Sequence, residues 1–470
     1  MDVTPDAAAP PHAPRTRRAV VVGLGQFGGG LGATRHLVRS GAQVVVTDTA
    51  SASKLAPAVA ALSDLVDAGA VELQLGAHDG VRWDGVDLVV ANPAIPKPWA
   101  HPLLISARER GIPVCSEINL LVESLPGTKV IAVTGSAGKS TSATLAHRAL
   151  SALGKRSHLG GNIGGSLLDS LAAIGPSDWV VLELSSAMLW WLGAGGEHFN
   201  PGGPGLRWNL RVAALTNISA NHIDWHGSFA HYAASKSMIR TLLASDGRFI
   251  SDFSRESPAA AERAAGEAAG RWWECPENLR CPAAPSIQLG VPGAHQQRNA
   301  RLAWQAARSA SDLDGEAFDD AAVARAFAEF TGLEHRLQFV GLHGGLRCFN
   351  DSKATTPEAT LLAIEAIGQP ERIHLIAGGF DKGTDLSPIA RLGNSLAGLY
   401  GIGATQAAVA SGNNAVCCET IERAVAQAKC RAQPGEVLLL SPGCASWDQF
   451  TNFERRGERF VELVRGLDPE

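Results

Sequence analysis

Tyrosine is scarce in this chain, with two tyrosines against eleven tryptophans among 470 residues. Long apolar runs are also absent, since none approaches the ~18 residues that a membrane-spanning helix needs. No apolar segment follows the Ala- and Pro-rich residues 1–14, so a secretory signal is not expected. The eight cysteines lack the paired spacing of a metal site, which favours free thiols in a reducing cytoplasm.

The charge and the length of the chain limit the class of partner and the number of domains. The formal net charge is −5, and the one dense basic stretch, Arg15–Arg18, is too short for a nucleic-acid face. We therefore expect no nucleic-acid partner. The composition is that of an ordinary globular protein, and the length favours about three domains. Residues 1–18 are predicted to form a flexible leader.

Strands and helices alternate along the rest of the chain, as in α/β proteins. We predict a Rossmann-like domain at 19–127, a central P-loop ATPase-like parallel sheet at 128–330 and a Rossmann-like α/β domain at 331–470. Helices are predicted at 27–39 and 292–310, and the Gly/Pro-rich residues 193–205 are predicted to form an exposed loop. Strands are predicted at 18–23, 42–48, 87–92, 112–117, 129–135, 179–186, 212–219, 345–351, 372–379, 398–403 and 436–443.

A first glycine turn, Gly23-x-Gly25-x-x-Gly28, follows a predicted strand and opens a predicted helix. Asp48 ends the next strand, which completes a dinucleotide-binding pattern. Glycines let the backbone approach a pyrophosphate, and the carboxylate accepts ribose hydroxyls. The pattern fits NAD, another nucleotide diphosphate, or tight packing of helix on strand without a ligand.

A second turn, TGSAGKST at Thr134–Thr141, also lies between a strand and a helix. It is shorter than the usual phosphate loop, with two residues between Gly135 and Gly138. Its backbone N–H groups and Lys139 suit ATP phosphates, and the hydroxyl of Ser140 or Thr141 suits Mg²⁺. An oxidoreductase that uses NAD leaves this second turn unexplained.

Polar residues follow two further strands of the central segment. Glu183 ends one strand, and His222, Asp224 and His226 follow another. Ligands gather at such strand ends in open parallel sheets, although capping and turn roles would also place polar residues there. A zinc hydrolase is disfavoured because no further ligand stands at the right spacing. Tyr232 and Lys236 share one helix face, where a surface pair is the simplest reading.

Three turns of the last segment resemble one another. NDSKATTPEA, GGFDKGTD and SPGCASWDQF each follow a predicted strand and combine small residues with Lys, Asp or Ser. The cationic side chains of Lys353 and Lys382 suit a small anionic substrate.

These motifs together resemble the Mur ligases, the ATP-dependent enzymes that build the peptide of bacterial cell-wall precursors. TGSAGKST, GGNIG, ELSS, NHIDWH, YAASK, EHR, NDSKAT, GGFDKG and SPGCASWDQF occur in the family's order and at similar spacing, over nearly the whole chain after the leader. The last four point to the members that add D-glutamate to UDP-N-acetylmuramoyl-L-alanine. The resemblance implies that the first glycine turn holds the UDP of a sugar-peptide substrate, and the second holds ATP.

The resemblance also implies roles for individual residues, with ATP and Mg²⁺ as cofactors. Lys139, Glu183, His222 and Lys236 match catalytic positions, and Lys236 matches a lysine that the family carries as a carbamate. The positions that match the family's metal site are Ser140, Glu183, His222 and Lys236. The implied ATP contacts are Gly135, Ser136, Ala137, Gly138, Lys139, Ser140, Thr141, Asn299, Arg336, Asp351 and Lys382. The implied contacts to the UDP substrate are Gly25, Gln26, Phe27, Asp48, Thr49, Asn162 and Ser185. The implied contacts to glutamate are Lys353, Thr355, Ser446, Trp447 and Phe453.

The chain also departs from the family pattern. Ala187 and Met188 follow ELSS where Phe-Gln is common, Gln296 stands where Asn is usual, and Ala50 replaces an Arg after Asp48-Thr49. A sister ligase that adds another amino acid, including the folylpolyglutamate type, is the nearest alternative. A non-catalytic nucleotide-binding regulator would be expected to have lost Lys139, Lys236 or Lys353, and all three are present. The sequence leaves the oligomeric state open, with a monomer the simplest expectation. Linkers near Gly127 and Thr331 are the hinge candidates.

Overall fold

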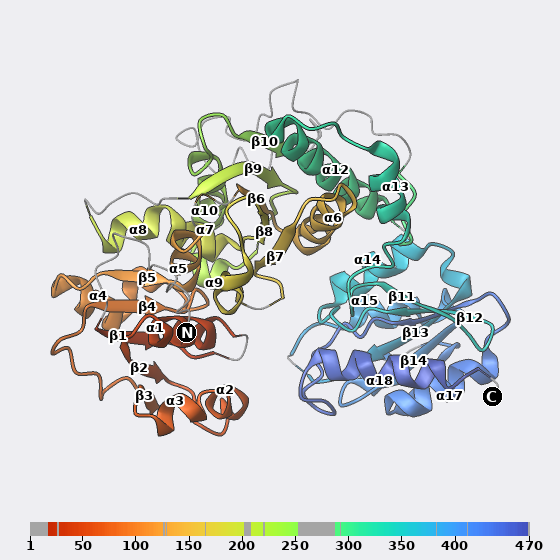
Figure 1. The fold of residues 1–470 in the computed structure, drawn as a ribbon. Helices are drawn as coiled ribbons and strands as arrows, with labels where there is room; N and C mark the ends of the chain where they lie inside the picture. The colour runs from red at the N-terminus through yellow and green to blue at the C-terminus, as the bar shows by residue number, and fades with distance from the viewer. Residues whose placement is uncertain are drawn as a thin grey trace, which may run out of the picture. The chain divides into compact units, whose positions relative to one another are not determined.

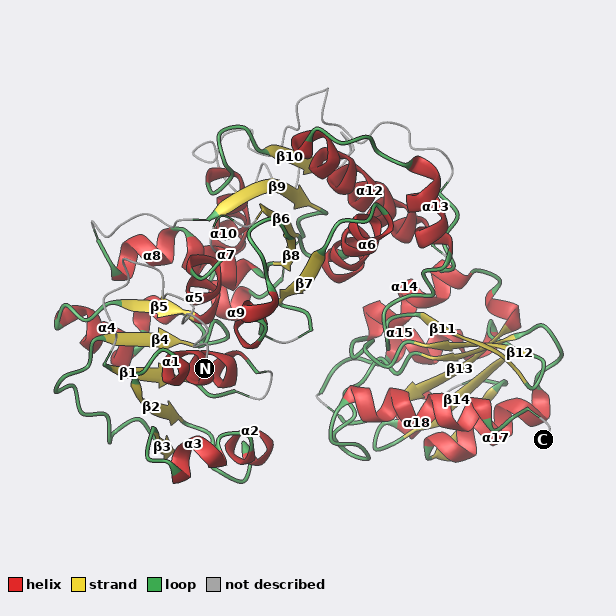
Figure 2. Cartoon of the chain, viewed as in Figure 1, coloured by secondary structure: helices red, strands yellow, loops and turns green. Residues whose placement is uncertain are grey.

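The structure is a computed structural model that describes residues 17–25, 28–125, 127, 129–164, 166–201, 208–219, 221–251, 287–291, 293–381, 383–410 and 412–468. The chain divides into two compact units, one of Met1–Ala283 with Leu302–Phe318 and one of Ala284–Arg301 with Asp319–Glu470. Strands and helices alternate in both units (Figures 1 and 2). Residues 1–16 of the predicted leader lie outside the described residues. The predicted boundaries between three domains remain a prediction.

The first sheet is the expected parallel α/β sheet, with strand order β3-β2-β1-β4-β5. β1 and β2 read as continuous runs of buried valines because helices cover both faces of such a sheet. β3 was not predicted, although its sequence VELQL alternates apolar and polar residues; only its first residue is buried. The elements are β1 (Arg18–Val22), α1 (Gly29–Arg39), β2 (Gln43–Asp48), α2 (Ala56–Ala60), α3 (Ser63–Asp67), β3 (Val71–Leu75), β4 (Leu88–Ala91), α4 (Pro102–Glu109), β5 (Val114–Ser116) and α5 (Glu117–Glu123).

The second sheet is also parallel, with order β10-β9-β6-β8-β7 and its first strand, β6, in the middle. Its two edge strands, β7 and β10, were not predicted, because short, partly polar strands resemble loops in sequence. The predicted exposed loop at 193–205 is wrong for Ala194–Phe199, which forms α8 and buries Phe199. The elements are β6 (Lys129–Thr134), α6 (Lys139–Ala152), β7 (Ser157–Gly161), β8 (Trp179–Glu183), α7 (Ser186–Leu192), α8, β9 (Asn209–Leu215), α9 (Ile223–His226), α10 (Phe229–Thr241), β10 (Arg248–Ser251) and α12 (Ala294–Asp314).

The third sheet is mixed and has the order β11-β12-β16-β13-β14-β15. β11 runs antiparallel to β12, and all other pairs are parallel. β11 and β15 were not predicted. The elements are α13 (Asp320–Ala328), β11 (Gln338–His343), β12 (Leu346–Asn350), α14 (Pro357–Ile367), β13 (Ile373–Gly378), α15 (Ser387–Ala390), β14 (Gly398–Ile402), α16 (Gln406–Val409), β15 (Ala415–Glu419), α17 (Ile421–Arg431), β16 (Val437–Leu440) and α18 (Phe453–Arg465).

Two further properties concern the described residues alone. None of their helices is both long enough and apolar enough to span a bilayer. The six described cysteines are free thiols.

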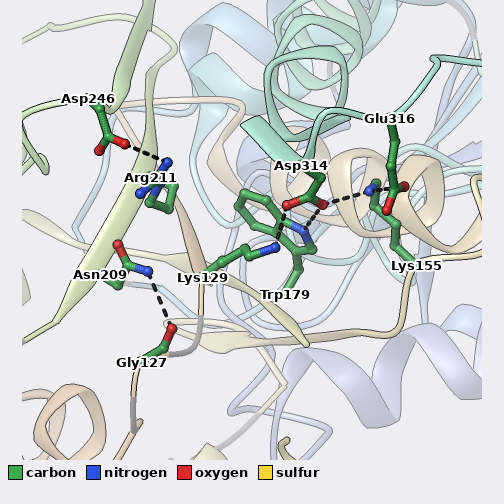
Figure 3. Close-up of polar contacts among 9 residues, drawn as sticks. All are labelled: Gly127, Lys129, Lys155, Trp179, Asn209, Arg211, Asp246, Asp314 and Glu316. Atoms are coloured by element: carbon green, nitrogen blue, oxygen red, sulfur yellow. Dashed lines mark hydrogen bonds and ion pairs between the residues drawn. The ribbon is translucent and has the colours of Figure 1, made fainter. Parts of the chain in front are cut away.

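A buried carboxylate ties the end of α12 to the start of the second sheet (Figure 3). Asp314 accepts hydrogen bonds from Lys129, from Lys155 at 2.6 Å and from Trp179 Nε1 at 2.9 Å. Burial raises the pKa of the Asp314 carboxyl, but these three donors outweigh that effect and leave the pKa below its ordinary value. Lys155 is itself buried and also pairs with Glu316 at 2.6 Å. The network therefore fixes the last turn of α12 against β6 and β8.

Asp314→Asn is expected to destabilise the fold by about 2–4 kcal/mol at pH 7, because it leaves the buried Lys155 ammonium with one partner fewer. Urea unfolding measures this. The depressed pKa of Asp314 means that its contribution is present above the ordinary pKa of 3.8 and is lost as pH falls through the folded-state value. The difference from wild type should therefore shrink in acid.

Asp246→Asn is the matched control, because the exposed carboxylate of Asp246 pairs with Arg211 at 2.8 Å (Figure 3). Breaking this exposed pair should cost under ~1 kcal/mol. Equal effects of the two substitutions at pH 7 would contradict the role given to Asp314.

Candidate active site

The second glycine turn lies at the carboxyl end of β6, in the middle of its sheet. Gly135 has φ 146°, and a Cβ built there would lie 1.9 Å from Thr216 Oγ1, so only glycine fits. Gly138 has φ 80° and caps α6, which begins at Lys139. The turn therefore presents backbone N–H groups at a helix N-terminus, the arrangement that binds phosphate.

The end of β9 supports this loop from one side. Asn217 Oδ1 accepts from the backbone N–H of Ala137 at 3.0 Å, and Asn217 Nδ2 donates to the Ala137 carbonyl at 2.9 Å. Ser136 is held by the Asn217 carbonyl, by Ser219 and by the Tyr232 hydroxyl at 2.7 Å. Lys139 Nζ donates to the Ser136 carbonyl at 3.0 Å. The loop is thus held in a phosphate-binding shape by neighbouring side chains.

Glu183 ends β8, the neighbour of β6 on the other side, and its side chain is buried. Asn162 Nδ2 donates to Glu183 Oε1 at 2.9 Å, and the Asn162 backbone N–H donates to the Glu183 carbonyl at 2.8 Å. Glu183 Oε2 is buried and has no hydrogen-bond partner among the described residues. A buried carboxylate oxygen without a partner is costly unless a proton or a cation satisfies it.

Lys236 lies on α10 and is 1% exposed, as is Tyr232 one turn earlier. The surface pair considered from the sequence is therefore wrong. Lys236 Nζ donates to Thr134 Oγ1 at 3.2 Å, at the end of β6. Burial lowers the pKa of Lys236 well below its ordinary value; the positive charge of Lys139 lowers it further, and Glu183 only partly opposes this. The surroundings of Lys236 therefore favour the neutral amine over the ammonium.

His222 follows β9 and caps α9 with φ 50°, a left-handed conformation that is strained for a residue with a side chain. Burial lowers its pKa, and the charges of Lys139 and Lys236 add to this. His226 is buried, and burial lowers its pKa to about 3, so its imidazole stays neutral. Within the described residues, no three His, Cys, Asp or Glu side chains gather as a metal site.

The first glycine turn lies at the carboxyl end of β1. Gly25 has φ 66°, and its backbone N–H donates to Asp48 Oδ2 at 3.2 Å. The Ala50 backbone N–H donates to Asp48 Oδ1 at 2.8 Å. Asp48 thus joins the first glycine turn to the start of the segment that follows β2. Its remaining lone pairs stay available to a ligand. Thr49 is exposed, whereas Gln26 and Phe27 lie outside the described residues.

Ser185 lies between Glu183 and α7, where its hydroxyl accepts from the Met188 backbone N–H at 3.1 Å. This helix cap does not require the Phe-Gln that is usual after ELSS, so Ala187 and Met188 leave the turn intact. In α12, Asn299 Nδ2 donates to Gln296 Oε1 at 3.3 Å. Gln296 therefore supplies an amide partner for Asn299.

The three similar turns of the second unit follow three neighbouring strands, β12, β16 and β13. Lys353 Nζ lies 3.7 Å from the ring centre of Phe453. Ser446 is buried, whereas Trp447 is 61% exposed and packs on Phe380. A small pocket at these strand ends is lined by Thr355, Phe380, Asp381, Thr384, Leu386, Thr405, Gly443 and Cys444. Lys382 lies outside the described residues.

The EHR motif has an unusual backbone. His335 and Leu337 have φ 61° and 45°, so Arg336 lies between two left-handed residues. Asp351 holds this segment: the Leu337 backbone N–H donates to Oδ1 at 2.9 Å, and the Ser441 hydroxyl donates to Oδ2 at 2.8 Å. Burial raises the pKa of Asp351 to about 7, although both hydrogen bonds oppose this.

The sequence reasoning missed Thr216 and Asn217, which shape the second glycine turn. The sequence does place Thr216 and Asn217 directly after the apolar run of a predicted strand, β9, which ends at the same sheet edge as β6. Finding them required the strand order, which places β9 directly beside β6.

Comparison with known proteins identifies the family. Three family models match the chain: the Mur ligase MurD-like N-terminal domain over 17–116, the Mur ligase middle domain over 133–273, and the Mur ligase glutamate ligase domain over 335–444. The UDP-N-acetylmuramoylalanine–D-glutamate ligase of Pelotomaculum thermopropionicum is 36% identical over 96% of this chain and 98% of its own. The chain belongs to the Mur ligases. The ligase of the same name from Acidobacterium capsulatum is 34% identical over 95% of this Mur ligase and 96% of its own length.

Solved structures support the fold of this Mur ligase. The UDP-N-acetylmuramate–alanine ligase of Thermotoga maritima has a TM-score of 0.54 at 17% identity, and the alignment covers 96% of this chain and 99% of that chain. The MurF ligase of the same organism, in complex with ADP, has a TM-score of 0.52 at 14% identity, and the alignment covers 96% of this chain and 97% of that chain. As a Mur ligase the enzyme depends on ATP and Mg²⁺.

Proposed function

We propose that this Mur ligase joins D-glutamate to UDP-N-acetylmuramoyl-L-alanine and converts ATP to ADP and phosphate. The observation that carries the proposal is the match to D-glutamate ligases over 95–96% of the chain. The site is consistent with this, because a phosphate loop, a buried carboxylate and a buried lysine with a lowered pKa meet at one sheet edge. The product belongs to peptidoglycan precursor synthesis, and with it to cell-wall formation and cell division.

The chemistry requires an activated carboxyl group, since a carboxylate does not react with an amine at neutral pH. An oxygen of the alanyl carboxylate bonds to the γ-phosphorus of ATP, the bond from that phosphorus to the bridging oxygen breaks, and ADP leaves. The glutamate amine, after losing a proton, bonds to the carbonyl carbon. The nitrogen of the tetrahedral intermediate then gives up a second proton, the bond from carbon to the phosphate oxygen breaks, and phosphate leaves the amide. Lys139 places positive charge beside the transferring phosphoryl group.

The residues of the site fit Mg²⁺. The unpartnered Oε2 of Glu183 is the kind of hard, buried oxygen that binds this ion, with the Ser140 hydroxyl and His222 as the other predicted ligands. When bound, Mg²⁺ neutralises charge on the phosphates. We also propose that Lys236 reacts with CO₂ to form a carbamate and release a proton, which turns a potential cation into an anion with two oxygens. The low pKa of Lys236 supports this, because only the neutral amine attacks CO₂.

The remaining assignments follow the resemblance. The first glycine turn, Asp48 and Thr49 would contact the UDP substrate from a domain of residues 19–127, and Asn162 and Ser185 would contact it from a domain of residues 128–330. The second glycine turn and Asn299 would contact ATP from the domain of residues 128–330. Arg336, Asp351 and Lys382, which lie beyond residue 330, would be further ATP contacts. A domain of residues 331–470 would bind glutamate. We propose a cytoplasmic monomer that acts on these small molecules without nucleic acid.

A sister ligase that adds another amino acid remains the second candidate. Phosphate release separates the two when ATP, Mg²⁺ and UDP-N-acetylmuramoyl-L-alanine are supplied with D-glutamate, L-glutamate, L-alanine, L-lysine or meso-diaminopimelate in turn. D-glutamate should be the preferred amino acid. Preference for any other would replace the proposal with the sister activity.

Lys353→Ala is expected to raise KM for D-glutamate by about tenfold to a hundredfold, because a lysine–carboxylate contact is a charge-assisted hydrogen bond. KM for the UDP substrate should stay near the wild-type value. Steady-state kinetics with each substrate varied in turn measures both.

Lys429→Ala is the control, because Lys429 lies on α17 and donates to the Gly344 carbonyl, in the turn before β12, whereas Lys353 follows the other end of β12. It should leave all KM values unchanged. An unchanged KM for glutamate in Lys353→Ala would remove Lys353 from the glutamate site.

A further inference from the structure

Three tryptophans from distant parts of the first unit contact one another. Trp99 lies in the loop after β4, Trp190 in α7 and Trp225 in α9. The ring centre of Trp99 lies 5.3 Å from that of Trp190 and 5.6 Å from that of Trp225, and Trp190 lies 5.8 Å from Trp225. Trp190 and Trp225 are 5% and 6% exposed. We call these three residues the tryptophan clamp.

The loop that carries Trp99 holds Trp225 at two further points. Trp225 Nε1 donates to the Pro93 carbonyl at 3.1 Å, and the Lys97 backbone N–H donates to the Trp225 carbonyl at 3.3 Å. The same loop contacts the first glycine turn, because Asn92 Nδ2 donates to the Gly23 carbonyl at 3.2 Å. A continuous set of contacts therefore runs from the first glycine turn to α9.

At α9, these contacts also reach the predicted catalytic residue His222. His222 lies three residues before Trp225 and has the strained φ of 50°. Such a conformation persists only where the surroundings hold it in place. His226 lies one residue after Trp225, and its Nε2 is 2.9 Å from the hydroxyl of Ser186, the first residue of α7. The clamp thus holds both the His222 turn and the helix that follows Glu183.

We infer that the tryptophan clamp positions His222 relative to the first glycine turn, so that this predicted metal ligand keeps a fixed place relative to the site proposed for the UDP substrate. Trp99, Trp190 and Trp225 are positioning residues, and their role rests on the proposed ligase function. Simple core packing would also bury these rings. It would not require the indole N–H and the backbone carbonyl of Trp225 both to bond to the one loop that touches the first glycine turn.

Trp225→Phe tests the inference, since it keeps an aromatic ring but removes the hydrogen bond to Pro93. Small misplacements of a catalytic group cost up to about a hundredfold in rate, so kcat/KM for the UDP substrate should fall by about tenfold to a hundredfold. KM for D-glutamate should not change. Hydrogen exchange of the peptide that contains His222 should become faster.

Trp191→Phe is the matched control. Trp191 is the next residue of α7 and is fully buried, and its ring centre lies 5.1 Å from that of Trp190 and 5.2 Å from that of Phe199. Its indole N–H has no partner among the described residues, so Trp191→Phe trims the packing beside the clamp without removing a hydrogen bond. It should leave kinetics and exchange near His222 unchanged. Equal losses in the two variants, or normal kinetics and exchange in Trp225→Phe, would overturn the inference. An inactive wild-type enzyme would instead count against the proposed function, while the exchange comparison would still decide the clamp.

Discussion

Lys236→Ala is expected to abolish most ligase turnover, by about a hundredfold or more, while the protein stays folded. The lysine is buried beside Glu183 and Lys139, where a plain ammonium would repel Mg²⁺. Its neutral amine can instead form the carbamate, whose oxygens suit a hard divalent cation. Removing the side chain removes that anion from the site.

Added short-chain carboxylates, such as acetate, should partly restore the activity of Lys236→Ala, because they can occupy the vacated space with a similar charge. Lys236→Met is the control, because its side chain fills the same volume and should permit no rescue. Circular dichroism and thermal unfolding check that both variants fold. Wild-type kcat in Lys236→Ala would refute the carbamate role.

Gly135→Ala is expected to remove ATP binding and, with it, ligase activity. The new Cβ would lie 1.9 Å from Thr216 Oγ1, and the φ of 146° is itself strained for alanine. The loop has to shift, and the Ser136 and Ala137 backbone groups held by Asn217 shift with it. Titration calorimetry with a non-hydrolysable ATP analogue should show at least about a hundredfold weaker binding, since several phosphate contacts are lost together.

Gly154→Ala separates this effect from simple backbone strain. Gly154 follows the same helix, α6, and also has positive φ, at 74°, but a Cβ there would meet nothing within 4 Å. It should cost about 1 kcal/mol of stability and leave ATP affinity unchanged. Equal ATP affinity in Gly135→Ala and Gly154→Ala would show that the second glycine turn is not the ATP site.

The sequence predicted the inner strands well, because β1, β6, β8 and β16 are buried on both faces and read as apolar runs. The five strands that were missed, β3, β7, β10, β11 and β15, include polar or half-exposed residues. Tertiary pairing, rather than local pattern, makes such segments strands.

The candidate site also has features that the sequence predicted and features that depend on tertiary structure. Motifs located Glu183 and Lys236, since the residue types and spacing are local. The burial of Lys236 and the support from Asn217 depend on strand order and helix packing, which no local pattern contains. The loop predicted at 193–205 is wrong for a related reason: Ala194–Phe199 forms a helix whose Phe199 packs on Trp191, a contact that no local pattern reveals.

The most direct test of the central claim is product analysis by mass spectrometry. Purified enzyme is incubated with UDP-N-acetylmuramoyl-L-alanine, D-glutamate, ATP and Mg²⁺, and ADP and the UDP-linked product are quantified together. We predict one ADP for each UDP-N-acetylmuramoyl-L-alanyl-D-glutamate formed, with no product when ATP is omitted and no requirement for a nicotinamide nucleotide. Absence of the amide product, or turnover of NADH or NADPH in its place, would contradict the account.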